Sequence, residues 1–252
     1  MEDFLELTNI NINSNFYEQI KQYALKQPNE EVCGFVILND FGEVEIYNCK
    51  NVHTDKAKAF EVEIETFLKI SKKNILAIYH SHVNHSANPS EYDLRQSEEL
   101  CIPFVVYSVR YDNFYIHIPQ SAPIKEFTQR QYVDGLQNCF VLTVDFYRKN
   151  CDFKFDNFNF YLERKRPTWE FTFETLLSAK NLFRNNGFKK IKKREITAND
   201  LIIFQAERNE IHFGVYLGND QFLHHPFYGF SQKSFFSEKI KDSIHSTYRK
   251  SV

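Results

Sequence analysis

The chain has 252 residues, of which 42% are hydrophobic and 25% are charged, a balance typical of a globular protein rather than a fibrous or disordered one. This length allows one large domain or two ordinary ones. The formal net charge of −2 does not favour general nucleic-acid binding, so no nucleic-acid partner is expected. The main basic run, Lys189 to Arg194, is interpreted as a solvated helix end or loop.

The N-terminus and the cysteines indicate where the chain is made. Residues Met1 to Phe4 lack the basic start and apolar run of a secretory signal, and no apolar stretch is long enough to span a bilayer. We therefore expect synthesis in a cytoplasm and no stable membrane insertion. An odd cysteine count, wide spacing and the lack of a C-x-x-C pair argue against a disulfide framework or an all-cysteine zinc site. The five cysteines are Cys33, Cys49, Cys101, Cys139 and Cys151.

The first part of the chain alternates between predicted helices and strands. A helix over 14–27 ends before Pro28, and strands over 31–38 and 44–47 form a hairpin. The further elements expected here are a helix over 64–72, a strand over 75–82, a helix over 90–100, and strands over 104–109 and 114–118. This mixture predicts an α/β domain over residues 1–120.

A polar segment bounded by Pro119 and Pro123 marks the junction, and the linker is assigned to residues 121–130. The second domain, residues 131–252, begins with helices and continues with a small antiparallel sheet, which is an α+β pattern. Its expected elements are helices over 139–149 and 173–185 and strands over 201–205, 210–217 and 221–225. Gly218-Asn219-Asp220 is a strong hairpin turn between the last two strands.

A first candidate site combines His80, His82, Asp93, Glu31 and Ser90. His80 and His82 are two apart at the end of a strand, so both imidazoles face the same side. With the carboxylate of Asp93 they make a catalytic zinc set that leaves a fourth position for water. Glu31 is the candidate general base, and Ser90 is a candidate donor to the developing oxyanion. Ser-x-x-Asp is also an N-cap pattern, which explains Ser90 and Asp93 without chemistry.

This pattern, His80-x-His82, seven residues, then Ser90-x-x-Asp93, with Glu31 upstream, resembles the MPN/JAMM zinc metallopeptidases over about residues 10–118. The resemblance implies a cytidine-deaminase-like fold and an enzyme that cleaves isopeptide or peptide bonds. Matched by position, His80, His82 and Asp93 would bind one zinc ion. Glu31 would activate the water, and Ser90 would assist the oxyanion.

A second candidate site combines Cys139, His212 and His224. Cys139 is placed at the start of a helix, where the dipole and free amides are expected to depress the pKa of its thiol. A nucleophilic thiol needs an imidazole base, and His212 is the candidate. His224 lies on the returning strand of the same hairpin, so it can orient His212 from a neighbouring position. Each piece alone has an ordinary explanation, since a single cysteine at a helix start is usually a buried small hydrophobic residue.

The segment from His212 to Gly218, His-Phe-Gly-Val-Tyr-Leu-Gly, together with Cys139 and His224, resembles the NlpC-type cysteine peptidases, which have a papain-like fold. The match covers about residues 130–240, and it implies that Cys139, His212 and His224 are catalytic. Two neighbours depart from the family pattern. Asn138 stands where Asp is usual, and Phe140 where many members have Ser.

An MPN/JAMM domain followed by an NlpC-type domain resembles the tail tip assembly proteins of long-tailed phages. This resemblance implies a virion tail tip protein made in the host cytoplasm, with tail tip and hub proteins as partners. NlpC-type enzymes typically cleave the γ-D-glutamyl to diamino-acid bond, so peptidoglycan stem peptides are the expected substrate. Two alternatives stay open: a structural plug or adaptor of the tail hub with one or both sites vestigial, and a cellular JAMM-type isopeptidase.

Overall fold

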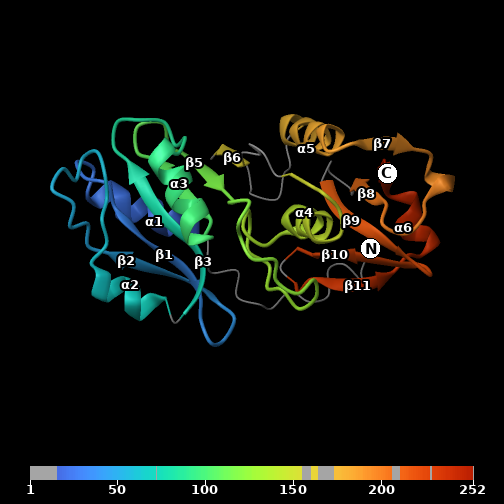
Figure 1. The fold of residues 1–252 in the computed structure, drawn as a ribbon, viewed down its shortest axis with the longest axis horizontal. Coiled ribbons are helices and arrows are strands. Elements are labelled where there is room, and N and C mark those ends of the chain that lie inside the picture. Colours follow the sequence, from blue (N-terminus) through green and yellow to red (C-terminus); the bar gives the residue numbers. More distant parts are fainter. Residues whose placement is uncertain are drawn as a thin grey trace. The chain divides into compact units, whose positions relative to one another are not determined.

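The computed structural model describes residues 16–71, 73–154, 160–163, 173–205, 211–227 and 229–251, which form two compact units (Figure 1). The N-terminal unit runs to Pro123, and the C-terminal unit begins at Ile124. Strand β6 (Phe160–Glu163) departs from this order, since it belongs to the N-terminal unit. None of the helices in these segments has the length and hydrophobicity needed to cross a membrane.

The N-terminal unit is built on a six-stranded sheet in the order β2-β1-β3-β4-β5-β6. Besides β6, its strands are β1 (Cys33–Leu38), β2 (Val44–Cys49), β3 (Asn74–His82), β4 (Phe104–Ser108) and β5 (Asn113–His117). Its helices are α1 (Phe16–Lys26), α2 (Ile64–Ile70) and α3 (Glu91–Leu100). Strands β3 and β4 are parallel, so the chain must cross between them, and α3 makes this crossover.

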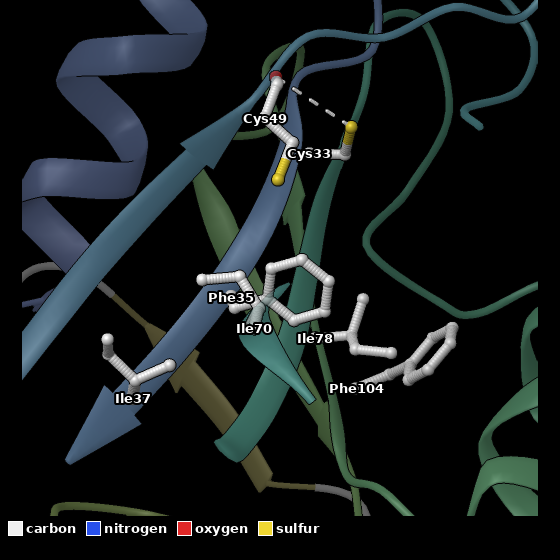
Figure 2. Packing of buried hydrophobic residues seen from close by; sticks show 7 residues of the cluster. All are labelled: Cys33, Phe35, Ile37, Cys49, Ile70, Ile78 and Phe104. Carbon is white, nitrogen blue, oxygen red and sulfur yellow. Dashed lines mark hydrogen bonds between the residues drawn. The ribbon is translucent and has the colours of Figure 1, made fainter. Parts of the chain in front are cut away.

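One face of this sheet carries a buried apolar cluster (Figure 2). The cluster consists of Cys33, Phe35, Ile37, Cys49, Ile70, Ile78 and Phe104. Successive strand residues point to opposite faces, so the alternate residues of β1 share this face. The neighbouring β3 is buried without a break from Leu76 to His82, as expected of a strand inside a sheet. The polar side chains at the end of β3 are therefore held in a dry setting.

The C-terminal unit is built on a second six-stranded sheet, all antiparallel, in the order β11-β10-β9-β8-β12-β7. Its strands are β7 (Phe188–Ile191), β8 (Leu201–Gln205), β9 (Ile211–Gly218), β10 (Gln221–His224), β11 (Gln232–Phe235) and β12 (Ile244–Lys250). Its helices are α4 (Cys139–Asn150), α5 (Phe173–Asn185), α6 (Glu238–Asp242) and the short 3₁₀ helix η2 (Lys193–Glu195).

Helix α4 is buried along Cys139–Tyr147, and aromatic packing fixes its start against β9. The ring of Phe140 meets Phe213 of β9 at 5.3 Å and Phe183 at 6.2 Å, both nearly edge-on. Such aromatic pairs add about 0.5–1.5 kcal/mol each beyond the area they bury. This contact keeps the first turn of α4 beside the strand that carries His212.

The expected helices and strands are confirmed within a few residues, and so are the mixed α/β classes; residues 14, 15, 72 and 210 of the expected elements lie outside the described residues. Two expectations are wrong. The basic run Lys189–Arg194 is neither a helix end nor a simple loop, because it lies in edge strand β7 and in η2. Exposed lysines are common on edge strands, where they discourage pairing with other chains. The second sheet has six strands rather than three, because β7, β11 and β12 are short or polar and carry no clear alternating pattern.

Candidate functional sites

The structure brings together His80 and His82, at the end of β3, and Asp93, in the first turn of α3. The two histidine Nε2 atoms lie 3.1 Å apart. Asp93 Oδ1 lies 3.5 Å from Nε2 of His80, and Oδ2 lies 3.8 Å from Nε2 of His82. One ligand atom from each residue falls within 4.8 Å of the other two, and all three side chains are buried.

The atoms of this cluster suit a metal ion. His82 Nδ1 lies 2.6 Å from the carbonyl oxygen of Ser86, so it donates its proton there and leaves Nε2 bare. Two ligands of a tetrahedral zinc ion are about 3.3 Å apart, given zinc–ligand bonds of about 2.0–2.1 Å. The observed separations of 3.1, 3.5 and 3.8 Å are near that value. The group formed by His80, His82 and Asp93 can therefore bind a metal ion.

Charges in this cluster favour an ionised Asp93. Burial raises the pKa of Asp93, but the neighbouring imidazoles of His80 and His82 and the hydroxyl of Ser90 together outweigh burial and hold this pKa well below its usual range. The pKa of His80 is lowered, chiefly by burial. For His82, burial lowers the pKa, but Asp93, the carbonyl of Ser86 and Glu31 together outweigh burial, and the net shift is upward. A buried carboxylate beside two imidazoles provides the negative charge that a divalent cation needs.

Ser90 serves as the N-cap of α3. Its Oγ accepts a hydrogen bond from the backbone N–H of Asp93 at 3.2 Å and donates to Oδ2 of Asp93 at 2.7 Å. The backbone N–H of Ser90 donates to the same Oδ2 at 2.7 Å, which completes a capping box. Ser90 and Asp93 therefore do form an N-cap, and this capping box also orients the Asp93 carboxylate toward the histidines. The oxyanion role of Ser90 stays a prediction.

Glu31 is placed beside this cluster by the pairing of β1 with β3. Cys33 lies opposite His80 in the antiparallel register, so Glu31, just before β1, is on the side of His82. The backbone of Glu31 is fixed by Lys56 and by the amide of Asn51. Only 4% of Glu31 is exposed, and burial raises the pKa of its carboxyl to about 7, with His82 lowering it and Asp93 raising it. A group with this pKa can exchange protons near neutral pH.

Two neighbours of this cluster have no sequence signal of their own. Phe60 stacks on the ring of His80, with 4.6 Å between centroids, and belongs to no motif. The Ser86 carbonyl is a backbone group, so residue type cannot reveal it. Phe60 restricts how the imidazole can turn, and Ser86 fixes which nitrogen of His82 is bare.

In the C-terminal unit, His212 and His224 are hydrogen-bonded neighbours. Nε2 of His212 lies 3.0 Å from Nδ1 of His224, and Nε2 of His224 lies 2.9 Å from Oγ of Ser234. His224 is directly opposite Gly214 rather than His212, so the two histidines are diagonal cross-strand neighbours. Since Nε2 of His212 is engaged by His224, Nδ1 is the nitrogen available to a thiol.

Cys139 begins α4 as expected, but the expected depression of its pKa is wrong. Cys139 is 1% exposed, and burial raises the pKa of its thiol to about 12. The backbone N–H groups of Phe213 and Phe140 lower this pKa, but by less than burial raises it. No hydrogen bond joins Cys139 to His212 within the described segments. The amide of Phe213 nevertheless shows that Cys139 lies next to the strand that carries His212.

Asn138, which stands where the family usually has Asp, is the N-cap of α4. Its Oδ1 accepts hydrogen bonds from the backbone N–H groups of Phe140 at 3.1 Å and Val141 at 3.0 Å. An Asp at this position would make the same bonds but would add a negative charge next to the thiol. The neutral amide therefore caps α4 without raising the pKa of Cys139 further.

His225 follows β10 and faces the ring of Tyr132 edge-on, with 5.4 Å between centroids. It is buried, and burial lowers its pKa to about 4. Its charge would disfavour protonation of both His212 and His224. His225 is therefore part of the electrostatic surroundings of this pair.

Comparison with known families assigns both units. Residues 14–123 match the family of prokaryotic homologs of the JAB domain, and residues 137–249 match the NlpC/P60 family. The chain therefore carries a JAB-like domain followed by an NlpC/P60 domain, which confirms the predicted order.

Over 219 residues the chain is 22% identical to "Tail tip assembly protein K" of Escherichia phage N15, a match that covers 86% of each sequence. This relative confirms the resemblance to phage tail tip assembly proteins. Solution structures of a protein from Desulfitobacterium hafniense and one from Salinibacter ruber are 19% and 20% identical, with TM-scores of 0.33 and 0.26. They cover 40% and 37% of this chain and 79% and 69% of their own chains. These TM-scores are too low to say more about the fold.

Proposed function

We propose that this chain is a phage tail tip protein with two peptidase domains. The observation that carries the tail assignment is the similarity to a tail tip assembly protein along 86% of both sequences. In this role the chain is assembled in the host cytoplasm, binds other tail tip and hub proteins, and resides at the tip of the virion tail. Its NlpC/P60 domain acts on stem peptides of the cell wall, during tail assembly or wall penetration.

The JAB-like domain is proposed to hydrolyse a peptide or isopeptide bond with one zinc ion held by His80, His82 and Asp93. When bound, zinc would supply a Lewis acid and an open coordination position. Glu31 accepts a proton from the attacking water and returns it to the leaving amine, a task that suits a buried carboxylate on the side of His82. Ser90 donates to the developing oxyanion once its hydroxyl turns from Asp93. The close approach of three buried ligand atoms carries this proposal.

The NlpC/P60 domain is proposed to cleave stem peptides through Cys139. The thiol gives its proton to Nδ1 of His212, and the sulfur attacks the amide carbonyl carbon. His212, held by His224, returns the proton to the leaving amine, and a thioester to Cys139 remains. Water then attacks the thioester with His212 as base, which releases the acid and restores the thiol.

Metal content and wall cleavage test the two domains separately. Metal analysis of the purified full chain is expected to find one zinc per chain in the wild type and none in His82→Ala. His85→Ala is a matched control, because His85 is an exposed loop residue with no part in the cluster. No zinc above background in the wild type would refute the metal assignment.

Clearing of purified peptidoglycan is expected from the wild type and not from Cys139→Ala. Cys151→Ala is the matched control, because Cys151 ends the same helix and lies outside the proposed site. Equal clearing by wild type and Cys139→Ala would rule out Cys139 as the nucleophile.

The second candidate is a structural plug or adaptor of the tail hub. The burial of Cys139, which keeps its thiol covered and protonated, specifically favours this alternative for the NlpC/P60 domain. The double variant His82→Ala with Cys139→Ala separates the candidates. Fully infectious particles carrying it would support the structural role, and loss of infectivity with normal tail assembly would support the catalytic one.

A further inference from the structure

The residue that orients His212 is itself a histidine, and a histidine can donate or accept a hydrogen bond through the same ring nitrogen. Nδ1 of His224 and Nε2 of His212 are 3.0 Å apart, so one of these two atoms carries the proton between them. Burial lowers the pKa of His212 to about 3 and that of His224 to about 2, and both rings are neutral near pH 7. Two arrangements of the protons therefore fit this contact.

Only one arrangement allows His212 to act as a base. If Nε2–H of His212 donates to His224, then Nδ1 of His212 is bare and can take a proton from a thiol. If Nδ1–H of His224 donates to His212 instead, His212 carries its own proton on Nδ1 and has no free lone pair. The second arrangement also fails once His212 becomes positively charged, because two N–H groups would then face each other.

We propose that Ser234 is the positioning residue that selects the first arrangement, by accepting a hydrogen bond from Nε2–H of His224. This role rests on the cysteine-peptidase function proposed above. Oγ of Ser234 lies 2.9 Å from Nε2 of His224. The register of β10 with β11 sets Ser234 opposite Phe222, diagonal to His224 on the same face.

Oγ of Ser234 has a second partner in Gln232. The side-chain amide of Gln232 donates to Oγ of Ser234 at 3.2 Å. A hydroxyl oxygen has two lone pairs, so it can accept from Gln232 and from His224 at the same time. A third residue such as aspartate would only accept, but a histidine needs a further partner to fix its tautomer. Ser234 supplies that partner two residues beyond Gln232 on the same short strand.

Removal of the hydroxyl changes where the protons lie. In Ser234→Ala, a buried Nε2–H of His224 has lost its acceptor, and the ring responds by moving the proton to Nδ1. That shift forces the proton of His212 onto Nδ1 and removes the base. We expect stem-peptide cleavage to fall by about fivefold or more, the equivalent of one lost hydrogen bond. Ser234→Thr keeps the hydroxyl and is expected to retain cleavage near the wild-type rate.

Long-range ¹H–¹⁵N correlation spectra of the full chain distinguish a protonated ring nitrogen from a bare one. A loss of packing alone would not move a proton from one ring nitrogen to the other. The wild type and Ser234→Thr are expected to show both His212 and His224 protonated on Nε2, and Ser234→Ala to show both shifted toward Nδ1. Ser246→Ala is a matched control, because it removes a serine hydroxyl that lies 2.9 Å from Nδ1 of His245. It is expected to leave the other two rings unchanged.

A wild-type spectrum with His224 protonated on Nδ1 would overturn the role of Ser234, and that measurement needs no variant to fold. Unchanged tautomers in a folded Ser234→Ala would overturn it as well. Cleavage by wild type and by Cys139→Ala is measured in parallel. Equal activity there refutes the peptidase function, whereas normal cleavage with the wrong tautomer refutes only the role of Ser234.

Discussion

Asp93 has two tasks that one substitution can separate. Its carboxylate faces His80 and His82, and Oδ2 also accepts from the backbone N–H and the hydroxyl of Ser90. Asp93→Asn keeps an oxygen that can accept from Ser90, so the capping box survives. It removes the negative charge that a zinc ion would share with the two imidazoles. We therefore expect Asp93→Asn to keep the cap of α3 and to bind zinc poorly.

The size of the effect follows from mass action. Loss of an outer partner of a zinc ligand already costs about 10–100-fold in affinity, so loss of the ligand itself is expected to cost more than about 100-fold. At free zinc 100 times the wild-type Kd, zinc stabilises the wild type by about 2.7 kcal/mol. At the same zinc concentration Asp93→Asn gains about 0.4 kcal/mol or less, since its Kd is no longer exceeded. For a domain of this size the difference corresponds to a shift in Tm of about 10 °C.

Thermal unfolding of each protein with zinc and with a chelator measures the stabilisation by zinc and the shift in Tm. With the chelator, Asp93→Asn is expected to be less stable than wild type, because it lacks the ionised carboxylate that His80 and His82 stabilise, and Asp93→Ala is expected to be about 0.5–1 kcal/mol less stable again because it also loses part of the capping box. The gain in stability on adding zinc is therefore compared within each protein. A zinc affinity for Asp93→Asn within tenfold of wild type would refute this explanation of the cluster, because Asp93 would then not be a ligand.

Three further changes test the electrostatics and packing of the two sites. Burial raises the pKa of Glu31 to about 7, so the protonated carboxyl is favoured in the fold, and the stability that it contributes at low pH is lost as pH rises toward 7. In metal-free protein, Glu31→Gln is therefore expected to be more stable than wild type by about 1–3 kcal/mol at pH 8 and equal to it near pH 4, as measured by urea unfolding. Asn138→Ala leaves two buried amides of α4 uncapped, and hydrogen exchange of that helix is expected to show a loss of about 1–2 kcal/mol, with Asn138→Asp as the control that keeps the cap. Phe213→Ala removes the ring that meets Phe140, and it is expected to destabilise the C-terminal unit by about 3–5 kcal/mol in urea with zinc binding unchanged.

Local patterns carried most of the predictions that are confirmed. The spacing of His80 and His82 requires only a strand, and the cap at Ser90 requires only the start of a helix, so both can be read from short segments. The hairpin turn after Gly218 brings His212 and His224 onto neighbouring strands in the same way. These features depend on residues close together in the chain.

Long-range register and burial could not be predicted in the same way. Glu31 reaches the cluster because Cys33 pairs with His80, far along the chain, and no local pattern states that pairing. Ser234 contacts His224 only through the register of β11 with β10. Strand β11 is short and polar, so the pattern of hydrophobic residues did not predict it. The pKa of Cys139 was predicted from its place at a helix start, but it is set by how completely the surrounding chain excludes water.

In both sites a hydrogen bond engages one ring nitrogen of a histidine and leaves the other nitrogen to face the site. In the N-terminal unit, Nδ1 of His82 is engaged by the carbonyl of Ser86, and Nε2 faces His80 and Asp93. In the C-terminal unit, Nε2 of His212 is engaged by His224, and Nδ1 is the nitrogen that the proposed mechanism uses. A carbonyl can only accept, so the tautomer of His82 is fixed by one contact. His224 can donate or accept, so the tautomer of His212 depends on a second contact, and Ser234 is the residue proposed to make it.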